Sequence, residues 1–323
     1  MAGILTNGVR ATQDLAYTTF NAALAEGMAS VRDEDLWVRE IAMEIPSNGE
    51  VELYDWLEAT EDFSEWVGER RFQALRENAY ALKNKDWAWG CEIKYPKFRD
   101  NKFLSQSMLF RQQGVNAKMH PQRKIAALLR GFATAGDECW DELPFFHAAH
   151  PVDFHDPSKG TFSNRITNSL TPANFAKARA AMMEFKDASG EILASPPDTM
   201  FVAPADAVTA EQIASSIVVP TVSGAGLNTG VALVARQKIR VVECPELSAE
   251  PGVWYLGRCR GPIKPMIFQR RSSPSVEWIS DLNSEYRKVH NKVRLGADYS
   301  AAFGWTFPQL LVRCGDSSAS TTL

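Results

Sequence analysis

Two stretches of the chain have the hydrophobic periodicity of α-helices. Residues 11–32 predict one helix, whose apolar side would carry Leu15, Phe20, Leu24 and Met28. Residues 103–132 predict a second and longer helix, within which Pro121 is expected to kink or divide the run, because proline has no amide hydrogen to donate. The first forty-odd residues hold few large apolar groups for their length, so they are expected to act as an arm that packs on another surface.

Between these helices, residues 69–101 have the period-two pattern of strands. Phe72, Leu75, Tyr80 and Leu82 precede a polar NKD turn, and alternating apolar residues follow it: Trp87, Trp89, Cys91, Ile93 and Tyr95. The pattern predicts a hairpin with two tryptophans close to its turn. An isolated two-stranded hairpin is marginally stable in water. Trp87 and Trp89 are therefore predicted to contact a partner surface.

The second half of the chain mixes helices and strands. Thr171 and Pro172 are expected to start a helix as its N-cap and first residue, and DAVTAEQIASSI predicts another. Strands are predicted at TMFVAP, IRVVECPEL, VWYLGR, KPMIFQRR, SVEWISDL, KVRLGADYS and WTFPQLLVRC. The fold class is α+β, with no βαβ nucleotide-binding pattern.

Composition narrows the functional classes. A formal net charge of −4 argues against a dedicated nucleic-acid-binding protein, although a small local patch could still touch nucleic acid. The five dispersed cysteines form no CxxC pair and predict reduced thiols. Neither a signal peptide nor an apolar run of about 20 residues is found, which predicts synthesis and folding in the cytosol.

The segment FFHAAHPVDFHDP holds three of the five histidines: His147, His150 and His155. They suggest a metal-dependent hydrolase, since His147 and His150 would share one face of a helix. However, Pro144 and Pro151 leave room for barely two turns, and two alanines stand where a zinc protease carries its catalytic glutamate. A loop whose histidines bond to backbone atoms is the favoured interpretation. No metal, cofactor or catalytic residue is predicted.

Several motifs resemble one family. EIAMEIPS and YDWL (residues 40–57), EWVGERR (65–71), HPQRKIAALLRGF (120–132), FFHAAHPV, KPMIFQRR and LGADYSAAFGWTFPQLLV together resemble the major head subunit of bacteriophage Mu and its Mu-like prophage relatives. The shared motifs span about residues 35–314. Within FFHAAHPV the shared positions are FF and HPV, so of the three histidines only His150 is shared, which favours a structural role for this segment.

The resemblance implies the tailed-phage major capsid protein fold of the HK-ninety-seven type. The expected parts are an N-terminal arm (1–60), an extended loop formed by the hairpin (61–101), a peripheral domain with a long spine helix (102–165), and an axial domain (166–283). Residues 284–315 would return to the peripheral domain, and 316–323 would form a flexible tail.

The implied function is structural. Subunits would assemble as pentamers and hexamers into an icosahedral head that encloses double-stranded DNA without sequence specificity, inside the host cytoplasm, and remain in the virion. The resemblance implies a separate scaffolding protein, a head maturation protease and a portal as partners, and leaves a decoration protein open. Trp87 and Trp89 are the predicted inter-subunit contact. An encapsulin-type compartment shell and the hydrolase remain the alternatives.

Overall fold

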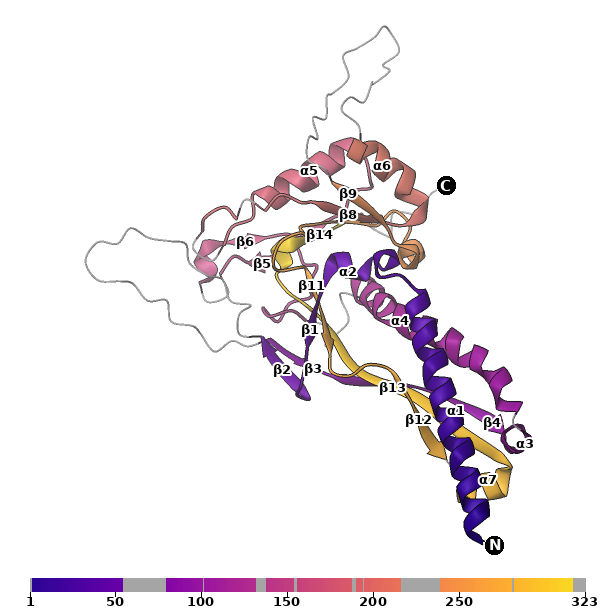
Figure 1. Cartoon of the computed structure of the whole chain (residues 1–323). Coiled ribbons are helices and arrows are strands. Elements are labelled where there is room, and N and C mark those ends of the chain that lie inside the picture. Colours follow the sequence, from indigo (N-terminus) through magenta and orange to yellow (C-terminus); the bar gives the residue numbers. More distant parts are fainter. Residues whose placement is uncertain are drawn as a thin grey trace.

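The fold is organised around one long strand, β13 (Lys292–Trp305), which pairs with three other strands. A computed structural model describes residues 2–54, 80–100, 102–131, 138–153, 156–187, 190–193, 195–215, 239–280 and 282–315. Two five-stranded sheets divide most of these strands between them (Figure 1). No described helix combines the length and apolar character that a membrane span requires.

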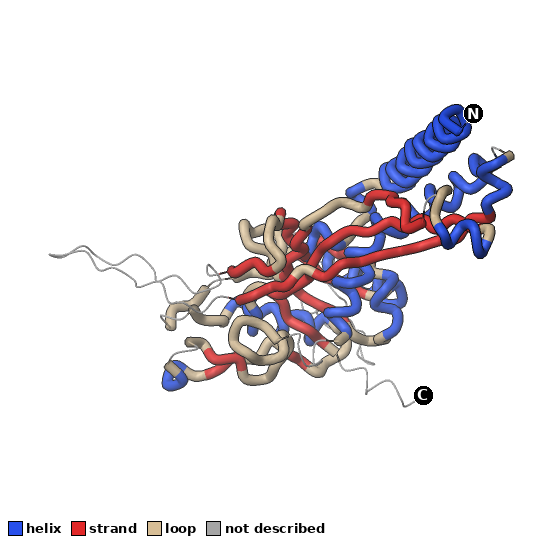
Figure 2. Tube along the Cα trace, turned by 90° about the horizontal axis from the view of Figure 1, so that it is seen from below, coloured by secondary structure: helices blue, strands red, loops and turns tan. Residues whose placement is uncertain are grey.

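The first sheet has the order β1-β11-β13-β12, with β4 also paired to β13. Its members are β1 (Ala42–Pro46), β4 (Lys85–Lys94), β11 (Met266–Arg270), β12 (Ser275–Ser280) and β13. β1 runs parallel to β11, whereas β4, β11 and β12 are all antiparallel to β13. Figure 2 shows the long strands running out along an elongated limb, and the N-terminus lies near its far end.

The second sheet has the order β7-β14-β10-β8-β9. It contains β7 (Arg165–Ile166), β8 (Thr199–Val202), β9 (Arg240–Glu243), β10 (Trp254–Gly257) and β14 (Leu311–Cys314). α5 (Pro172–Met183) and α6 (Ala207–Ser215) cover it, and their apolar residues share a core with the buried Trp254 (Figure 1). As predicted, Thr171 caps α5: its hydroxyl accepts a hydrogen bond from the Asn174 amide at 3.2 Å.

Short elements complete the framework: α2 (Val38–Ile41), α3 (Tyr95–Arg99) and α7 (Glu285–His290), with two-stranded ladders β2–β3 (Val51–Tyr54, Tyr80–Lys83) and β5–β6 (His150–Pro151, Thr161–Phe162). A carboxylate joins three of the distant segments. Glu246, which follows β9, accepts hydrogen bonds from Trp37 Nε1 at 2.9 Å and from Gln122 Nε2 at 2.8 Å. The N-terminal region and the long helix are thereby fixed to the second sheet.

The N-terminal helix α1 (Ala2–Ser30) packs along the long helix α4 (Ser107–Arg130). Phe20 stacks on Phe110 with ring centroids 4.1 Å apart. Where the helices approach most closely, Gly27 and Gly114 bring the two backbones together, since a Cβ on either would overlap a backbone carbonyl of the other helix. The predicted arm therefore has a surface to pack on within its own chain.

The structure corrects parts of the expected pattern. Pro121 lies inside α4 without dividing it. On α1, Phe20 and Leu24 are buried, but Leu15 is exposed, because the five-residue step from Leu15 to Phe20 moves it off the shared face.

The predicted hairpin is not formed as expected. β4 has the alternation that the sequence shows, but it pairs with β13, and β3 pairs with β2. Phe72, Leu75 and the rest of residues 55–79 lie outside the described residues. A period-two pattern fixes which side chains share a face and leaves the partner strand to tertiary packing.

The expected domain limits also differ from the sheets. β11 and β12 fall within the predicted axial range of 166–283 yet belong to the first sheet, and β14 falls within the predicted return at 284–315 yet joins the second. The chain thus crosses between the two sheets more often than a division into consecutive segments allows.

The contact between α1 and α4 leads to a stability prediction. Gly114→Ala should lower the free energy of unfolding by about 1–3 kcal/mol, because the new methyl group has to displace the α1 backbone. Gly90→Ala in β4 is the matched control, since a Cβ there meets its nearest atoms at 3.7 and 3.8 Å, which are ordinary contacts. Urea denaturation of the two variants measures the difference. Equal stabilities would show that the helices do not pack this closely.

Candidate functional site

The described part of the histidine-rich segment contributes both buried and exposed residues. His150 is fully buried in β5, His147 is half-buried, and His155 lies outside the described residues. The rings of His147 and His150 meet edge to face with centroids 5.8 Å apart. His147 does not join the polar contacts of His150; its Nδ1 accepts the amide hydrogen of Ala149. The three predicted candidates therefore do not converge as one set of ligands.

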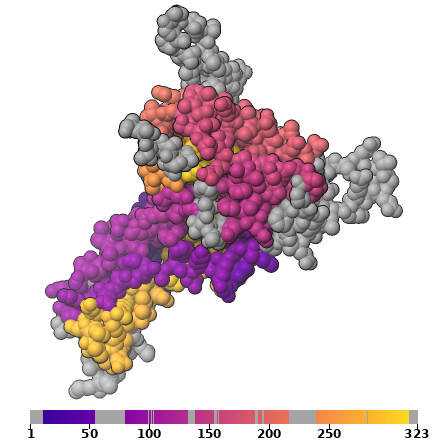
Figure 3. Space-filling model, turned by 180° about the vertical axis from the view of Figure 1, so that it is seen from behind, coloured from indigo at the N-terminus to yellow at the C-terminus, as the bar shows by residue number. Residues whose placement is uncertain are grey.

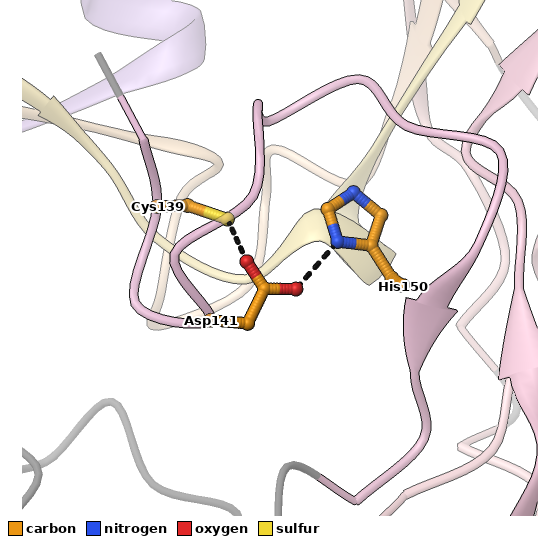
Figure 4. Close-up of side chains that lie close together, drawn as sticks. All are labelled: Cys139, Asp141 and His150. Atoms are coloured by element: carbon orange, nitrogen blue, oxygen red, sulfur yellow. Dashed lines mark hydrogen bonds and ion pairs between the residues drawn. The ribbon is translucent and has the colours of Figure 1, made fainter. Parts of the chain in front are cut away.

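His150 belongs instead to a buried chain of hydrogen bonds (Figure 4). Its Nε2 lies 2.9 Å from the Phe145 carbonyl oxygen, and its Nδ1 lies 2.6 Å from Asp141 Oδ2. A carbonyl can only accept, so Nε2 must donate to it. With Asp141 ionised, Nδ1 also donates, and both ring protons have acceptors in a fully buried ion pair.

Asp141 also accepts hydrogen bonds from a thiol and a backbone amide of the same segment. Its Oδ1 accepts from Cys139 Sγ at 2.7 Å and from the Leu143 amide at 3.2 Å. Burial alone would raise the pKa of Asp141, but the hydrogen bonds from His150 and Cys139 outweigh it and leave that pKa below its usual range. Burial and the nearby Asp141 charge raise the pKa of the Cys139 thiol far above its ordinary value. A thiol held in this state next to a carboxylate is a poor nucleophile.

The donor atoms of Cys139, Asp141 and His150 lie within 4.8 Å of one another and form the one group with metal-ligand chemistry among the described residues. Ligands arranged tetrahedrally around zinc are separated by about 3.3–3.6 Å, given bonds of about 2.0–2.3 Å. The separations of 2.7 and 2.6 Å are both shorter than this, and the 2.6 Å between Asp141 and His150 is that of a short charge-assisted hydrogen bond. The cluster therefore fits a hydrogen-bonded network better than a zinc site.

This network holds the aromatic joint between the two sheets. Phe145 stacks on Trp305, at the end of β13, with centroids 4.2 Å apart, and Phe146 contacts Tyr255 of β10 at 5.6 Å. The Phe145 carbonyl also accepts from Asn164 Nδ2 at 2.6 Å. The FF…HPV motif thus serves as architecture, as the sequence favoured. Sequence reasoning missed Cys139 and Asp141, whose only signal is their place just ahead of that motif.

Trp87 and Trp89 lie on β4, on the sheet face that α4 covers, and both are half-buried. Trp87 Nε1 donates to the Ala301 carbonyl at 3.1 Å, and its ring meets His120 edge to face at 4.9 Å. Trp89 meets Phe110 edge to face at 5.7 Å. Both tryptophans therefore have partners within the chain, and their predicted role between subunits stays a prediction that concerns only their exposed parts.

A groove of about 280 Å³ runs between α4 and these tryptophans. Its floor includes Trp87, Trp89 and Tyr299, and its α4 wall includes Gln113, Asn116, Ala117, His120 and Arg123. Burial, followed by Lys124 and Arg123, lowers the pKa of His120 to about 4, so this imidazole is neutral at pH 7. His120 Nδ1 is hydrogen-bonded to the Tyr299 hydroxyl.

A second polar network fixes the base of the β2–β3 ladder. Asn84 Nδ2 donates to Ser47 Oγ at 2.8 Å, and Ser47 in turn donates to Glu52 Oε1 at 2.8 Å. The Tyr54 hydroxyl donates to Gln269 of β11 at 2.7 Å, and burial raises the pKa of Tyr54 to about 12. This ladder flanks residues 55–79, so the first sheet fixes both ends of that segment.

The Asp141–His150 pair leads to a prediction. Asp141→Asn should lower the free energy of unfolding by about 3 kcal/mol, because it leaves the buried His150 without its counter-charge. Since the folded pKa of Asp141 is lowered, its contribution is present above the unfolded pKa of about 3.9 and is lost as the pH falls through the folded value. The variant should lack that acid-side loss in thermal denaturation measured across pH.

His147→Gln is the control, with an expected change of about 0.5 kcal/mol or less, because that ring is half-exposed and outside the network. Elemental analysis of the wild-type protein is the second measurement. One equivalent of tightly held zinc that Asp141→Asn removes would show that the cluster is a metal site.

Comparisons with known proteins agree with the architecture. Residues 124–307 match the family described as phage capsid protein, and residues 13–169 match the family described as Mu-like prophage major head subunit gpT. The Mu-like prophage FluMu major head subunit of Haemophilus influenzae is 23% identical over 91% of this chain and 70% of that protein. The major capsid protein of Escherichia phage Mu is 22% identical over 84% of this chain and 64% of that protein.

Solved structures share the fold. The subunit in the procapsid of bacteriophage JBD30 has a TM-score of 0.54 and 20% identity, covering 95% of this chain and 75% of that one. A virus-like particle from Pyrococcus furiosus has a TM-score of 0.50 at 8% identity, covering 92% and 98%. The matched families are structural head proteins and not enzymes, which removes the hydrolase alternative. The N-terminal half is similar to the Mu-like prophage major head subunit, and the chain belongs to the phage capsid protein family.

Proposed function

We propose that this chain closes into the icosahedral head of a Mu-like tailed phage as rings of five and six subunits around double-stranded DNA. The observation that carries the proposal is the limb of the first sheet. Its strand β4 pairs with β13 along one edge, and no other described strand pairs with it. Figure 3 shows this limb projecting away from the part that holds the second sheet.

The two sheets correspond to the two domains of such a subunit. We assign the first sheet with α4 to the peripheral domain and the second sheet with α5 and α6 to the axial domain. Intrachain contacts at Glu246 and at the Phe145–Trp305 stack tie the two together, so ring formation can use outer surfaces and leave the joint intact. Rings of this kind use heterologous contacts, in which one surface meets a different one on the next copy.

The tryptophan pair is proposed as one of those surfaces. Trp87 and Trp89 keep part of their area exposed on the limb, beside the groove and next to the free edge of β4. Aromatic residues are enriched in the buried centres of protein interfaces. Leu53 of β2, which is 64% exposed, adds apolar area at the base of the expected extended loop, on a ladder that the first sheet holds in place.

Other partners follow from the assembly of a tailed-phage head. A scaffolding protein, a maturation protease and a portal would act during assembly in the host cytoplasm, and the finished subunit would remain in the virion. A decoration protein is consistent with the JBD30 capsid, which carries minor capsid protein trimers. An encapsulin-type shell shares the fold alone, whereas the Mu-like family match favours the phage head.

The Trp87→Ser, Trp89→Ser double variant tests the proposed surface. It should remain folded with reduced stability, because each ring also packs within the chain, and it should fail to form closed shells. Trp87→Phe with Trp89→Phe is the matched control and should still assemble, since it keeps most of the apolar area. Sedimentation velocity with the scaffolding protein separates subunits from shells, and near-UV circular dichroism reports folding. Normal shells from a folded double-serine variant would contradict the proposal.

A further inference from the structure

The long helix α4 has an unusual charge composition for this chain. Asp and Glu make up 39 of the 323 residues, so a segment of 24 residues would carry about three. The 24 residues of α4 carry no acidic side chain and five basic ones: Arg111, Lys118, Arg123, Lys124 and Arg130. In a protein with a net charge of −4, this is a concentrated positive segment.

Two of these cations are neutralised by the N-terminal region. Arg111 forms an ion pair with Glu26 of α1, and Lys118 pairs with Asp33 at 2.6 Å. They belong to the contact that holds the helices together. Within the described part of the chain, no ion pair joins Arg123, Lys124 or Arg130 to an acidic group. The C-terminal half of α4 therefore keeps its positive charge.

The side chains that accompany these cations are amides. Gln112, Asn116, Arg123, Ala127 and Arg130 follow one another at steps of four, seven, four and three residues, which places them on one face of the helix. Gln112, Arg123 and Ala127 are exposed, and Asn116 and Arg130 are half-exposed. Lys124 borders this face, with its ammonium nitrogen 4.1 Å from the centroid of the Trp87 ring. The basic face of α4 is defined here as Gln112, Asn116, Arg123, Lys124 and Arg130.

We propose that the basic face of α4 contacts the phosphate groups of the enclosed double-stranded DNA. The inference rests on the proposed function, because it requires the chain to enclose DNA. Arginine, lysine and amide side chains supply most contacts to the DNA backbone, and such contacts carry no sequence information. Arg123 and Arg130 are seven residues apart, so they lie about 10 Å from each other along the helix and can reach different phosphates.

The strength of this contact suits a container. Three cations per subunit neutralise at most about three phosphates, which gives weak and salt-sensitive binding. A more basic surface would hold DNA tightly and impede its movement, whereas a lumen without cations would leave the repulsion between packed phosphates unrelieved. The groove shares Asn116 and Arg123 with this face and adds His120, whose imidazole is neutral at pH 7.

Fluorescence anisotropy with a random-sequence 30-base-pair duplex tests the proposal on the full-length, unassembled chain. Arg123→Gln, Lys124→Gln and Arg130→Gln are combined in one variant. Removing three phosphate contacts should reduce the slope of log K against log salt concentration by about 2–3. It should also weaken binding in 50 mM NaCl by more than about tenfold, since phosphate contacts dominate non-specific affinity.

The control variant changes three exposed cations elsewhere to Gln: Lys177 in α5, Arg260 in the loop after β10, and Lys288 in α7. It has the same net charge as the α4 variant and should keep the wild-type slope. Equal slopes for wild type and the α4 variant, or an equal loss in the control, would overturn the assignment of the face.

Electron microscopy of the α4 variant separates this inference from the shell proposal. The variant should form closed shells like the wild type, because it keeps both tryptophans and the glutamine side chains retain polar groups beside them. Failure of the α4 variant alone to form shells would mean that the face binds protein, for example an acidic segment of a second copy, and would overturn the inference. If the wild type also forms no shells, the shell proposal fails, while the salt slopes still report whether this face binds phosphate.

Discussion

The pairing of β13 with three separate strands is the constraint on which the rest of the structure depends. β11 and β12 precede β13 closely in the sequence, whereas β4 lies about 200 residues earlier, and all three pair antiparallel with this one strand. One face of the resulting sheet buries Val293, Leu295 and Ala297 in a core shared with α1 and α4. A slip of one residue would turn those side chains to the opposite face, so the buried face fixes the register.

The end of β13 also organises the joint to the second sheet. Trp305, its last residue, stacks on Phe145, and Phe145 lies in the segment that the Cys139–Asp141–His150 network holds in shape. Asn164 bonds the same carbonyl as His150, so a polar contact from each side fixes the position of the aromatic pair. Cys139, Asp141 and His150 resemble a catalytic or metal site in their residue types, but their role here is to hold the segment that carries Phe145.

The local pattern of apolar and polar residues was enough to predict most helices and strands, but it did not show which strands pair with one another. The Thr171 cap, the alternation of β4 and the long helix α4 all depend on residues close in sequence, and the sequence showed them. The pairing of β4 with β13 joins residues about 200 positions apart, and no local pattern encodes it. Asp141 was missed for the same reason: its role comes from a buried histidine nine residues away that only the folded loop brings within 2.6 Å.

The same framework explains how the subunit can build a shell. Its two sheets are tied together inside the chain, and the limb offers an edge strand, half-exposed tryptophans and a basic helix face to the outside. The most direct test is a cryo-electron microscopy reconstruction of the particles that the full chain forms with its scaffolding protein. The account predicts a closed icosahedral shell of five- and six-membered rings, with the limb of each subunit against its neighbour. Particles without closed symmetry, or a shell whose subunits leave β4 and its tryptophans uncovered, would contradict it.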